Sequence, residues 1–565
     1  MDYLLRPSDP EAARELASSC NISATIAQVL LNRGIENAES ARSFLAPLLS
    51  GLTSPDKMAD RDIAADRLAR AVRARERVAV FGDYDVDGTA SAAIMGDILE
   101  RLGGEVMVLV ANRFEGGYGF SEPALKRILQ TRPKLVVACD CGSSDHPRLE
   151  MAKKAGVDVI VVDHHLVPSE TLPALAFLNP RRPDCGFPYK GLASVGLVLS
   201  LAAAVRASLG VALDLRPWLD LVALGTIADV APLTGDNRRL VRAGLALLGC
   251  GNGRPGIVAL REAARIRPNA VIGAGEIAFR FAPRLNAAGR LGDQSLTLAL
   301  LRARDLMEAR SLAVRVERIN QQRKVIERRV TEEAIAQVLT CYGPNPKSGI
   351  IAAKEGWHRG VVGISASRLA DRFGVPSVVI ALQDGIGRGS CRSCRGFPLF
   401  DAMVRCREIL DNFGGHQAAM GISIHSSQIE AFRSAFSDAV SEKLAEQEQW
   451  TNLPQIDVQI DPGVFDLPPA SDLALLEPVG EANAEPVFLV PEAYVEESQV
   501  VGNEHLKLSL RVGSHKFSAF GYQQGKRSVP IGKPITALGI FRPDSWSGRD
   551  QIELWLSEFE NTKEF

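Results

Sequence analysis

Four runs rich in valine and isoleucine alternate with helix-like segments between residues 75 and 165. The runs are RVAVF at 77–81, EVMVLV at 105–110, KLVVAC at 134–139 and DVIVV at 158–162. Strands that are apolar along their whole length are buried on both faces, and strands that alternate with helices pair in parallel. The pattern therefore predicts an α/β domain whose parallel sheet is covered by helices on both faces.

The chain has 565 residues, which is too many for one hydrophobic core. A strand–helix–strand pattern returns at 349–381, the stretch 296–339 holds no glycine or proline, and short strands dominate after 452. We expect a multidomain α/β protein with five segments. They are a helical lead-in (1–70), a parallel-sheet domain (71–295), a long connecting helix (296–340), a second α/β domain (341–445) and a small β-barrel or sandwich (450–565).

Charge and cysteine content limit the classes of function. The net charge of −2 argues against a protein coated in basic charge, so a nucleic-acid site would have to be local. No apolar stretch reaches the roughly 20 residues that span a bilayer, and the first residues lack the apolar core of a signal peptide. Nine cysteines, an odd number, do not suggest a disulfide framework. We expect a cytoplasmic protein without a membrane segment.

Acidic residues stand at the ends of predicted strands or helices. They stand in GDYDVDG (Asp83, Asp85, Asp87), in VVACDCG (Asp140), in VVDHH (Asp163, with His164 and His165) and in GTIADVAPL (Asp229). A single aspartate after a strand is usually a turn or a helix cap. Four such groups at matching positions instead favour a metal centre, because ligands gather at the carboxyl ends of parallel strands.

These motifs, in order, resemble the four motifs of the DHH phosphoesterase superfamily. Further segments narrow the resemblance to RecJ-like single-strand DNA exonucleases, from about residue 20 almost to the end. They are NRFEGGYGF (112–120), APRLNAAGRLG (282–292), GWHRGVVGISASRLA (356–370), GSCRS (389–393), FGGHQAAMG (413–421) and EPVGEANAEPVF (477–488). The sequence departs from the family at Ser194 in GLASVG, where glycine is favoured, and at GEAN. It also has Phe81 where some superfamily members have histidine.

The resemblance implies a DHH catalytic domain, a DHH-associated substrate-binding domain and a C-terminal OB-like nucleic-acid-binding barrel. It also implies a centre with two ions, Mn²⁺ with Mg²⁺ as the alternative. The implied ligands are Asp83, Asp85, Asp87, Asp140, His164 and Asp229, with Asp140 as the bridge and His165 facing the substrate phosphate. Two such ions lower the pKa of water and offset charge on the attacked phosphate.

A second half-site is expected around GSCRS and FGGH. Small residues let backbone N–H groups approach a phosphate, and arginine binds it bidentately. The candidates there are Ser390, Arg392, Gly414, Gly415 and His416. Further candidates for phosphate contacts are Arg113, Arg284, Asn286 and Arg290. In the C-terminal strands, most aromatic residues are expected in the core, although Trp546, Trp555, Phe517, Phe520 and Tyr522 are candidates for base stacking.

The resemblance implies a 5′→3′ exonuclease that hydrolyses single-stranded DNA to 5′-mononucleotides in repair and recombination. The implied partners are single-stranded DNA, a single-strand-binding protein and a helicase. One alternative is a nanoRNase or cyclic-dinucleotide phosphodiesterase of the same superfamily, which the long lead-in, connecting helix and barrel disfavour. Another is a non-catalytic single-strand binder, which the complete set of metal ligands disfavours.

Overall fold

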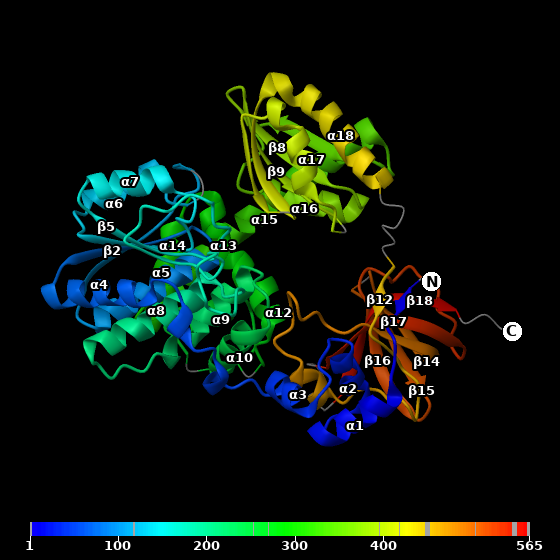
Figure 1. Ribbon diagram of the computed structural model, residues 1–565. Helices are drawn as coiled ribbons and strands as arrows, with labels where there is room; N and C mark the ends of the chain where they lie inside the picture. The colour runs from blue at the N-terminus through cyan, green and yellow to red at the C-terminus, as the bar shows by residue number, and fades with distance from the viewer. Residues whose placement is uncertain are drawn as a thin grey trace. The chain divides into compact units, whose positions relative to one another are not determined.

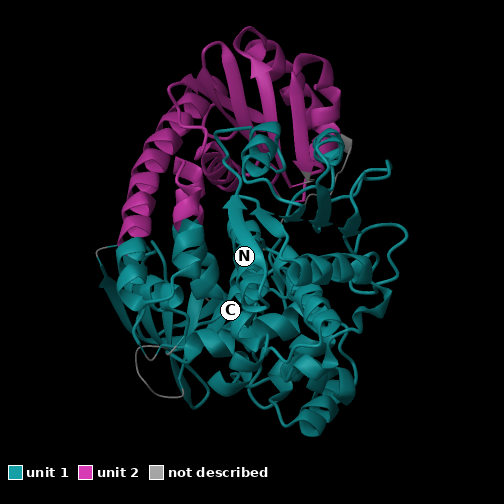
Figure 2. Cartoon of the chain, turned by 90° about the vertical axis from the view of Figure 1, so that its left-hand side faces the viewer, with its two compact units in different colours: residues 1–285, 297–313, 453–565 teal, residues 286–296, 314–452 magenta. Residues whose placement is uncertain are grey.

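The computed structural model describes residues 3–116, 119–251, 253–268, 270–394, 396–416, 418–446, 453–502, 504–544 and 551–561. The chain forms two compact units, coloured separately in Figure 2. Unit 1 comprises residues 1–285, 297–313 and 453–565, and unit 2 comprises residues 286–296 and 314–452. Within the described ranges, no helix has both the length and the apolar character needed to cross a membrane.

Unit 1 contains the predicted parallel sheet. Its strands are β2 (Arg77–Gly82), β3 (Glu105–Val110), β4 (Leu135–Cys139), β5 (Asp158–Val162) and β6 (Ala176–Leu178), in the order β3-β2-β4-β5-β6. The first four strands match the predicted runs to within one residue. Because β2, β4 and β5 are neighbours, the residues that follow them emerge at the same edge of the sheet.

Helices cover both faces of this sheet, as the apolar runs predict (Figure 1). One face packs against α6 (Glu122–Gln130) and α7 (His146–Lys154), and the other against α4 (Arg61–Ala74), α5 (Val86–Arg101) and α8 (Ser194–Leu209). Ala79 and Phe81 point to the α6–α7 side and are completely buried. Phe81 is therefore a core residue. Its ring meets that of Phe120 edge to face, with the ring centroids 5.6 Å apart.

The region after the sheet is helical. It comprises α9 (Leu219–Ala228), α10 (Gly235–Gly249), α11 (Pro255–Ala263), α12 (Ala274–Glu276), a π-helix (Ile277–Phe281), α13 (Ala282–Leu291), α14 (Gln294–Arg302) and α15 (Leu306–Tyr342). The helix expected over 296–340 is thus divided in two. The Asp305 carboxylate accepts hydrogen bonds from the amides of Met307 (2.8 Å) and Glu308 (3.0 Å), so it caps a new helix. The chain first passes from unit 1 into unit 2 within α13, returns within α14, and passes into unit 2 again within α15.

The two ends of the chain share one hydrophobic core in unit 1. The N-terminal part forms β1 (Leu4–Leu5), α1 (Pro10–Cys20), α2 (Ala24–Leu31) and α3 (Ala38–Leu45), and β1 pairs with β12 (Gln455–Ile456). The C-terminal part adds β13 (Val458–Gln459), α19 (Ala470–Leu475), β14 (Phe488–Val501), β15 (His505–Val512), β16 (His515–Gly521), β17 (Pro534–Pro543) and β18 (Ile552–Asn561). The pairing of β14 with β17 closes these strands into a barrel.

Arg238 ties the helical region to both of these parts. It lies on α10, is buried, and donates hydrogen bonds to the main-chain carbonyls of Phe44 and of residues 475–478. Burial lowers the pKa of its guanidinium to about 9. Five carbonyl acceptors therefore replace the carboxylate that usually accompanies a buried arginine.

Unit 2 is a second α/β layer structure. Its sheet has the order β10-β11-β9-β8-β7, with β7 (Ile350–Glu355), β8 (Ser377–Gln383), β9 (Ile386–Arg392), β10 (Asn412–His416) and β11 (Ala419–His425). One face packs on α15 and α16 (Val362–Phe373), and the other on α17 (Leu399–Arg405) and α18 (Ile429–Glu446).

Candidate functional site

The candidate metal ligands gather at the carboxyl edge of the unit 1 sheet. Asp83, Asp140 and Asp163 directly follow β2, β4 and β5. The strands hold these positions in register, because the amide of Asp83 donates to the carbonyl of Cys139 and the amide of Asp140 to that of Val162. The strand-end argument from the sequence therefore brings the right segments together.

Asp85 starts α5 and faces the same edge. As the N-cap, its carboxylate accepts a hydrogen bond from the amide of Gly88 at 3.0 Å. A Cβ on Gly88 would lie 2.5 Å from the backbone nitrogen of Asp83, so a larger residue would push α5 away from β2. The glycine in GDYDVDG thus allows the helix to begin directly against the strand end.

Asp87 and Asp229 complete the acidic cluster from two helix ends. The two Asp87 carboxylate oxygens accept hydrogen bonds from the amides of Ser194 (2.9 Å) and Val195 (3.0 Å), the first residues of α8. Asp229 follows the last residue of α9, and its Oδ2 lies 3.5 Å from Nε2 of His164. Backbone donors at a helix N-terminus stabilise the Asp87 anion and fix its orientation.

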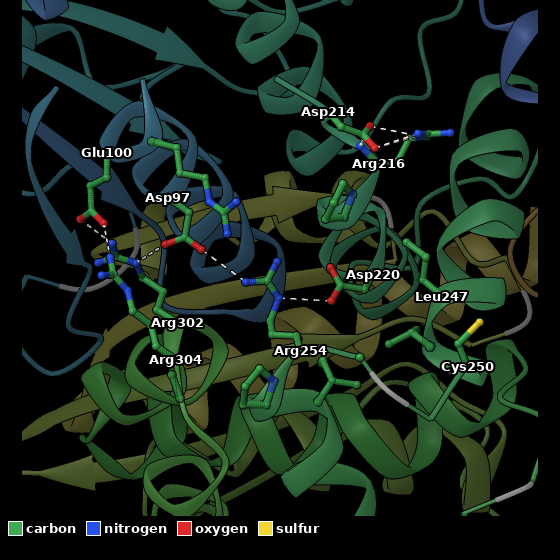
Figure 3. Close-up of a pocket in the computed structure, with 17 residues that line it drawn as sticks. Asp97, Glu100, Asp214, Arg216, Asp220, Leu247, Cys250, Arg254, Arg302 and Arg304 are labelled. Atoms are coloured by element: carbon green, nitrogen blue, oxygen red, sulfur yellow. Dashed lines mark hydrogen bonds and ion pairs between the residues drawn. The ribbon is translucent and has the colours of Figure 1, made fainter. Parts of the chain in front are cut away.

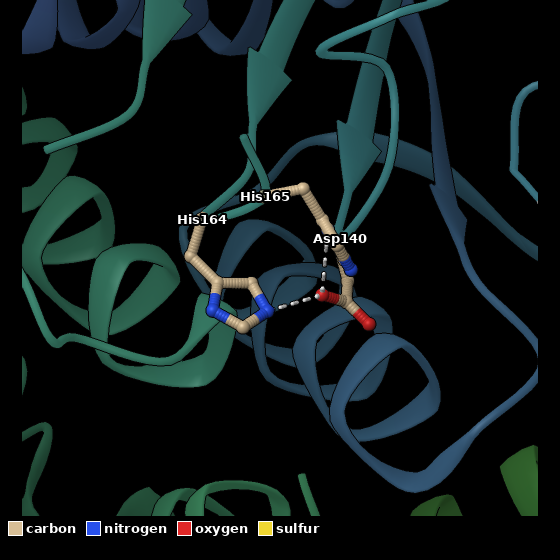
Figure 4. A group of neighbouring side chains, drawn as sticks. All are labelled: Asp140, His164 and His165. Carbon is tan, nitrogen blue, oxygen red and sulfur yellow. Dashed lines mark ion pairs between the residues drawn. The ribbon is translucent and has the colours of Figure 1, made fainter. Parts of the chain in front are cut away.

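Three overlapping groups of ligand atoms are compact enough to hold metal ions, with all atoms of a group within 4.8 Å of one another. The groups are Asp83–Asp85–Asp140, Asp87–His164–Asp229 and Asp140–His164–His165. Figure 4 shows the two histidines beside Asp140, whose Oδ1 lies 3.3 Å from Nε2 of His164 and 4.0 Å from Nδ1 of His165. Asp140 and His164 each belong to two groups, so the groups form one continuous centre.

The carboxylates of this centre repel one another, so a bound cation would stabilise their charged forms. Burial, followed by repulsion between neighbouring carboxylates, raises the pKa of Asp87 to about 7 and that of Asp229 to about 9. The same causes hold the pKa values of Asp83 and Asp140 well above that of an exposed aspartic acid. The Oδ2 atom of Asp83 is buried without a hydrogen-bond partner among the described residues. Hard oxygen donors with an imidazole fit Mn²⁺ or Mg²⁺.

Asp163 has a different task from its neighbours. Its Oδ1 accepts hydrogen bonds from the amides of His164 (2.8 Å) and His165 (3.2 Å) and lies 2.7 Å from Nδ1 of His165, while Oδ2 accepts one from the amide of Ser143. Burial alone would lower the pKa of His165, but the contact with Asp163 raises it to about 9. These contacts hold the pKa of Asp163 well below its usual range, although burial opposes them. Asp163 therefore orients and charges His165, a role the sequence did not reveal.

The predicted phosphate contacts outside the metal centre are dispersed. The Cζ atom of Arg113 lies 5.4 Å from the ring of Tyr84, inside the GDYDVDG motif. Arg284 donates a hydrogen bond to the carbonyl of Arg280 at 2.7 Å, within its own helical segment. Asn286 and Arg290 belong to unit 2, where Arg290 donates to the carbonyl of Gly360 at 3.3 Å. Of these contacts, the one made by Arg113 reaches a metal-site motif.

Ser390 and Arg392 form a polar group on β9 in unit 2. Arg392 donates hydrogen bonds to Ser390 Oγ (2.7 Å) and to the carbonyl of Cys391 (2.8 Å). A Cβ on Gly363, in the first turn of α16, would lie 2.9 Å from Nη2 of Arg392 and 3.1 Å from Oγ of Ser390. The guanidinium, the hydroxyl and the start of a helix thus meet, which is the composition of an anion site.

The glycine motif predicted beside this group lies on the same sheet. Gly414 and Gly415 belong to β10, which pairs with β11, and β11 pairs with β9. A Cβ on Gly415 would lie 2.4 Å from the carbonyl oxygen of Ala419, and its φ of 141° favours glycine. The side chain of His416 lies outside the described part of the structure.

Aromatic residues of the barrel divide between its core and its surface. Phe517 is buried, as expected, whereas Trp555 and Tyr522 are 39% and 61% exposed. A continuous row runs over β15, β16 and β18: the ring centroid of Phe520 lies 5.3 Å from Trp555 and 5.6 Å from His505, and Tyr522 stacks on His505 at 4.8 Å. The expectation that most of these aromatics are core is therefore wrong for this row. Trp546 lies outside the described residues.

A separate cavity of about 1010 Å³ in unit 1 holds none of the predicted site residues (Figure 3). Ion pairs cross its wall: Arg254 contacts Asp97 (3.3 Å) and Asp220 (3.2 Å), and Arg302 contacts Asp97 (2.8 Å) and Glu100 (2.6 Å). The carboxylates of α5 and α9 already neutralise these two arginines, so the network joins helices rather than presenting free charge to a ligand.

Comparison with known proteins agrees with this arrangement. Residues 77–226 match the model of the DHH family N-terminal domain, residues 346–442 match the DHHA1 domain and residues 456–558 match the RecJ OB domain. The single-stranded-DNA-specific exonuclease RecJ of Bacillus subtilis (strain 168) is 33% identical over 99% of this chain and 70% of its own length. RecJ of Escherichia coli (strain K12) is 35% identical over 88% of this chain and 89% of its own length.

Solved structures give the same result. The crystal structure of RecJ in complex with Mn²⁺ from Thermus thermophilus matches with a TM-score of 0.82 at 28% identity, covering 100% of this chain and 80% of that one. The Mg²⁺ complex from the same organism matches with a TM-score of 0.75 at 28% identity, covering 100% and 79%. The relatives, the three domains and the metal-site motifs all agree, and the chain belongs to the RecJ family of single-stranded-DNA-specific exonucleases.

Proposed function

We propose that this chain hydrolyses single-stranded DNA from the 5′ end and releases 5′-mononucleotides, in DNA repair and recombination. The observation that carries the proposal is the convergence of carboxylates and imidazoles from three strand ends and two helix ends into one buried centre. The substrate class follows from the family, whose curated members are named single-stranded-DNA-specific exonucleases.

Two Mn²⁺ ions are the cofactor we propose, with Mg²⁺ as the alternative, since solved relatives contain one or the other. Asp83, Asp85 and Asp140 would hold one ion, and Asp87, His164, Asp229 and the shared Asp140 the other. Such a pair lowers the pKa of water and offsets the negative charge of the attacked phosphate. The protein contributes the rigid placement of these ligands, which the amides at the start of α8 and the cap of α5 provide.

His165 is proposed to bind a non-bridging oxygen of the scissile phosphate. In the metal-free chain its pKa of about 9 keeps the ring protonated at neutral pH, and Asp163 fixes its orientation through Nδ1. A fixed cation aimed at developing negative charge stabilises the transition state without reorganisation during the reaction.

The Ser390–Arg392 group is proposed to bind the 5′-terminal phosphate. An exonuclease must distinguish the end of a strand from its interior, and all internal phosphates present the same charge to a metal centre. A guanidinium, a hydroxyl and a helix N-terminus suit a terminal dianion. The remaining candidates for phosphate contacts are Arg113, Arg284, Asn286, Arg290, Gly414, Gly415 and His416.

The exposed aromatic row of the barrel is proposed to stack on unpaired bases, because every base offers a π-face to such a surface. The Cζ atom of Arg542 lies 4.5 Å from the Trp555 ring, and Glu485 holds this guanidinium in place through hydrogen bonds of 2.7 and 2.6 Å. A single-strand-binding protein and a helicase are the partners that the repair role implies.

End-labelled DNA tests the proposed polarity. A single strand carrying a label on its 5′ nucleotide should release that label as a mononucleotide in the earliest time points with Mn²⁺, while a 3′ label should stay on long fragments. EDTA should stop both reactions. Early release of the 3′ label, or release in EDTA, would contradict the proposal.

A further inference from the structure

Ser194 connects the acidic centre to α8 through both its backbone and its side chain. It is fully buried, and its amide donates to Oδ2 of Asp87. Its hydroxyl donates a hydrogen bond to Oδ1 of Asp140 at 2.9 Å. One residue therefore touches the carboxylates of two candidate ligands, which lie 107 and 54 residues away in the sequence.

The two contacts have different requirements. Any residue other than proline supplies the amide that binds Asp87, whereas the contact with Asp140 needs a side chain with a hydroxyl group. Glycine at this position would keep the first contact and lack the second. The hydroxyl thus gives Asp140 a hydrogen bond that the backbone at position 194 cannot supply.

The backbone conformation and the neighbouring charges of Asp140 both act against a fixed orientation of its carboxylate. Its backbone has a φ of 62°, in the left-handed region that aspartate adopts at a cost. The carboxylates of Asp85, Asp87 and Asp229 are close enough to act on its charge. The hydrogen bond from Ser194 to Oδ1 restricts the rotation of the Asp140 carboxylate about its Cβ–Cγ bond.

We propose that Ser194 is a positioning residue that holds the Asp140 carboxylate in the orientation in which it bridges two divalent ions. The inference rests on the metal role proposed above for Asp140. Partners of this kind that orient a metal ligand contribute strongly to affinity, and their loss commonly costs about tenfold or more. This chain therefore binds divalent ions more tightly than it would with glycine at position 194.

Mn²⁺ binding to the full chain tests the role without relying on turnover. The free Mn²⁺ signal in electron paramagnetic resonance gives stoichiometry and affinity for the unaltered chain, Ser194→Ala and Ser194→Gly. Both variants should bind Mn²⁺ about tenfold more weakly, because both lack the hydroxyl. A matched control is Ser91→Ala, which removes another fully buried hydroxyl that has no hydrogen-bond partner among the described residues. It should leave the affinity unchanged.

A double-mutant cycle separates this inference from the proposed function. Asp140→Ala should lower the stoichiometry or affinity of Mn²⁺ binding, and Ser194→Ala should add no further loss in that background. Unaltered Mn²⁺ binding in Asp140→Ala would overturn the metal role of Asp140 itself. Weaker Mn²⁺ binding in Asp140→Ala together with unaltered Mn²⁺ binding in Ser194→Ala would overturn only the role of Ser194. If Ser194→Ala and Ser91→Ala lowered the Mn²⁺ affinity equally, Ser194 would have only a packing role. Thermal melts of the two metal-free variants would then show equal destabilisation.

Discussion

Replacing Asp163 with asparagine should lower the pKa of His165 and so reduce its protonation at neutral to mildly alkaline pH. Asparagine keeps an oxygen beside Nδ1 but carries no negative charge. Burial lowers the pKa of His165, and Asp163 raises it, for a net change from 6.5 to about 9. That difference corresponds to about 3 kcal/mol in favour of the protonated ring. Without the carboxylate, burial should lower the pKa of His165 from about 9, although the charges of Asp229 and Asp85 still act to raise it.

The expected change in the protonated fraction of His165 is large enough to measure by NMR. At pH 8 about nine in ten rings should be protonated in the unaltered metal-free chain, and a much smaller fraction in Asp163→Asn. The measurement is a proton NMR titration of the eight histidines, with the His165 signal assigned by its loss in His165→Gln. Asp145→Asn is a matched control, because Asp145 is also buried but accepts its hydrogen bonds from the amide of Phe120 and from the Arg148 guanidinium. A His165 ring that still titrates near pH 9 in Asp163→Asn would show that Asp163 does not set its charge.

Three further changes have expected outcomes. Arg392→Ala should lower kcat/KM on 5′-phosphorylated strands by about ten- to a hundredfold and on 5′-hydroxyl strands much less; equal losses on both would assign Arg392 to another phosphate. Trp555→Ala should weaken single-strand binding, measured by fluorescence anisotropy, by about 1–3 kcal/mol, whereas Tyr494→Ala, on β14 outside the row, should not. The metal-free chain should lose thermal stability between pH 6 and 9, because folding raises the pKa of Asp87 to about 7 and of Asp229 to about 9. The stability from these protonated groups is complete below about pH 4 and is lost as pH rises through those values; a melting temperature that rises over this range would contradict it.

The sheet and the position of the candidate metal centre were predictable because they follow from local patterns. Uniformly apolar runs mark strands buried on both faces, and residues after parallel strands share one edge. Asp83 and Asp140 could therefore be placed together without knowing any contact between them. The alternation of side chains along a strand is a further local pattern. Phe517 and Phe520 are three residues apart on β16, so they face opposite sides of the barrel wall.

Contacts between distant segments could not be read in the same way. The hydroxyl of Ser194 meets Asp140 only once α8 has packed against the sheet, and nothing in GLASVG indicates that contact. Asp163 looks like another ligand in sequence, and only the fold turns it toward His165. The interruption before α15 depended on Asp305 acting as a cap within a stretch of strong helix formers.

The most direct test of the account compares hydrolysis with binding in Asp140→Ala. With Mn²⁺ and a 5′-phosphorylated single strand, nucleotide release should fall below about one per cent of the unaltered rate, because the shared ligand is lost. Affinity for the same strand in EDTA should stay within about threefold, since backbone and base contacts lie outside the metal centre. Turnover that remains above a few per cent would contradict the central claim that Asp140 bridges the catalytic ions.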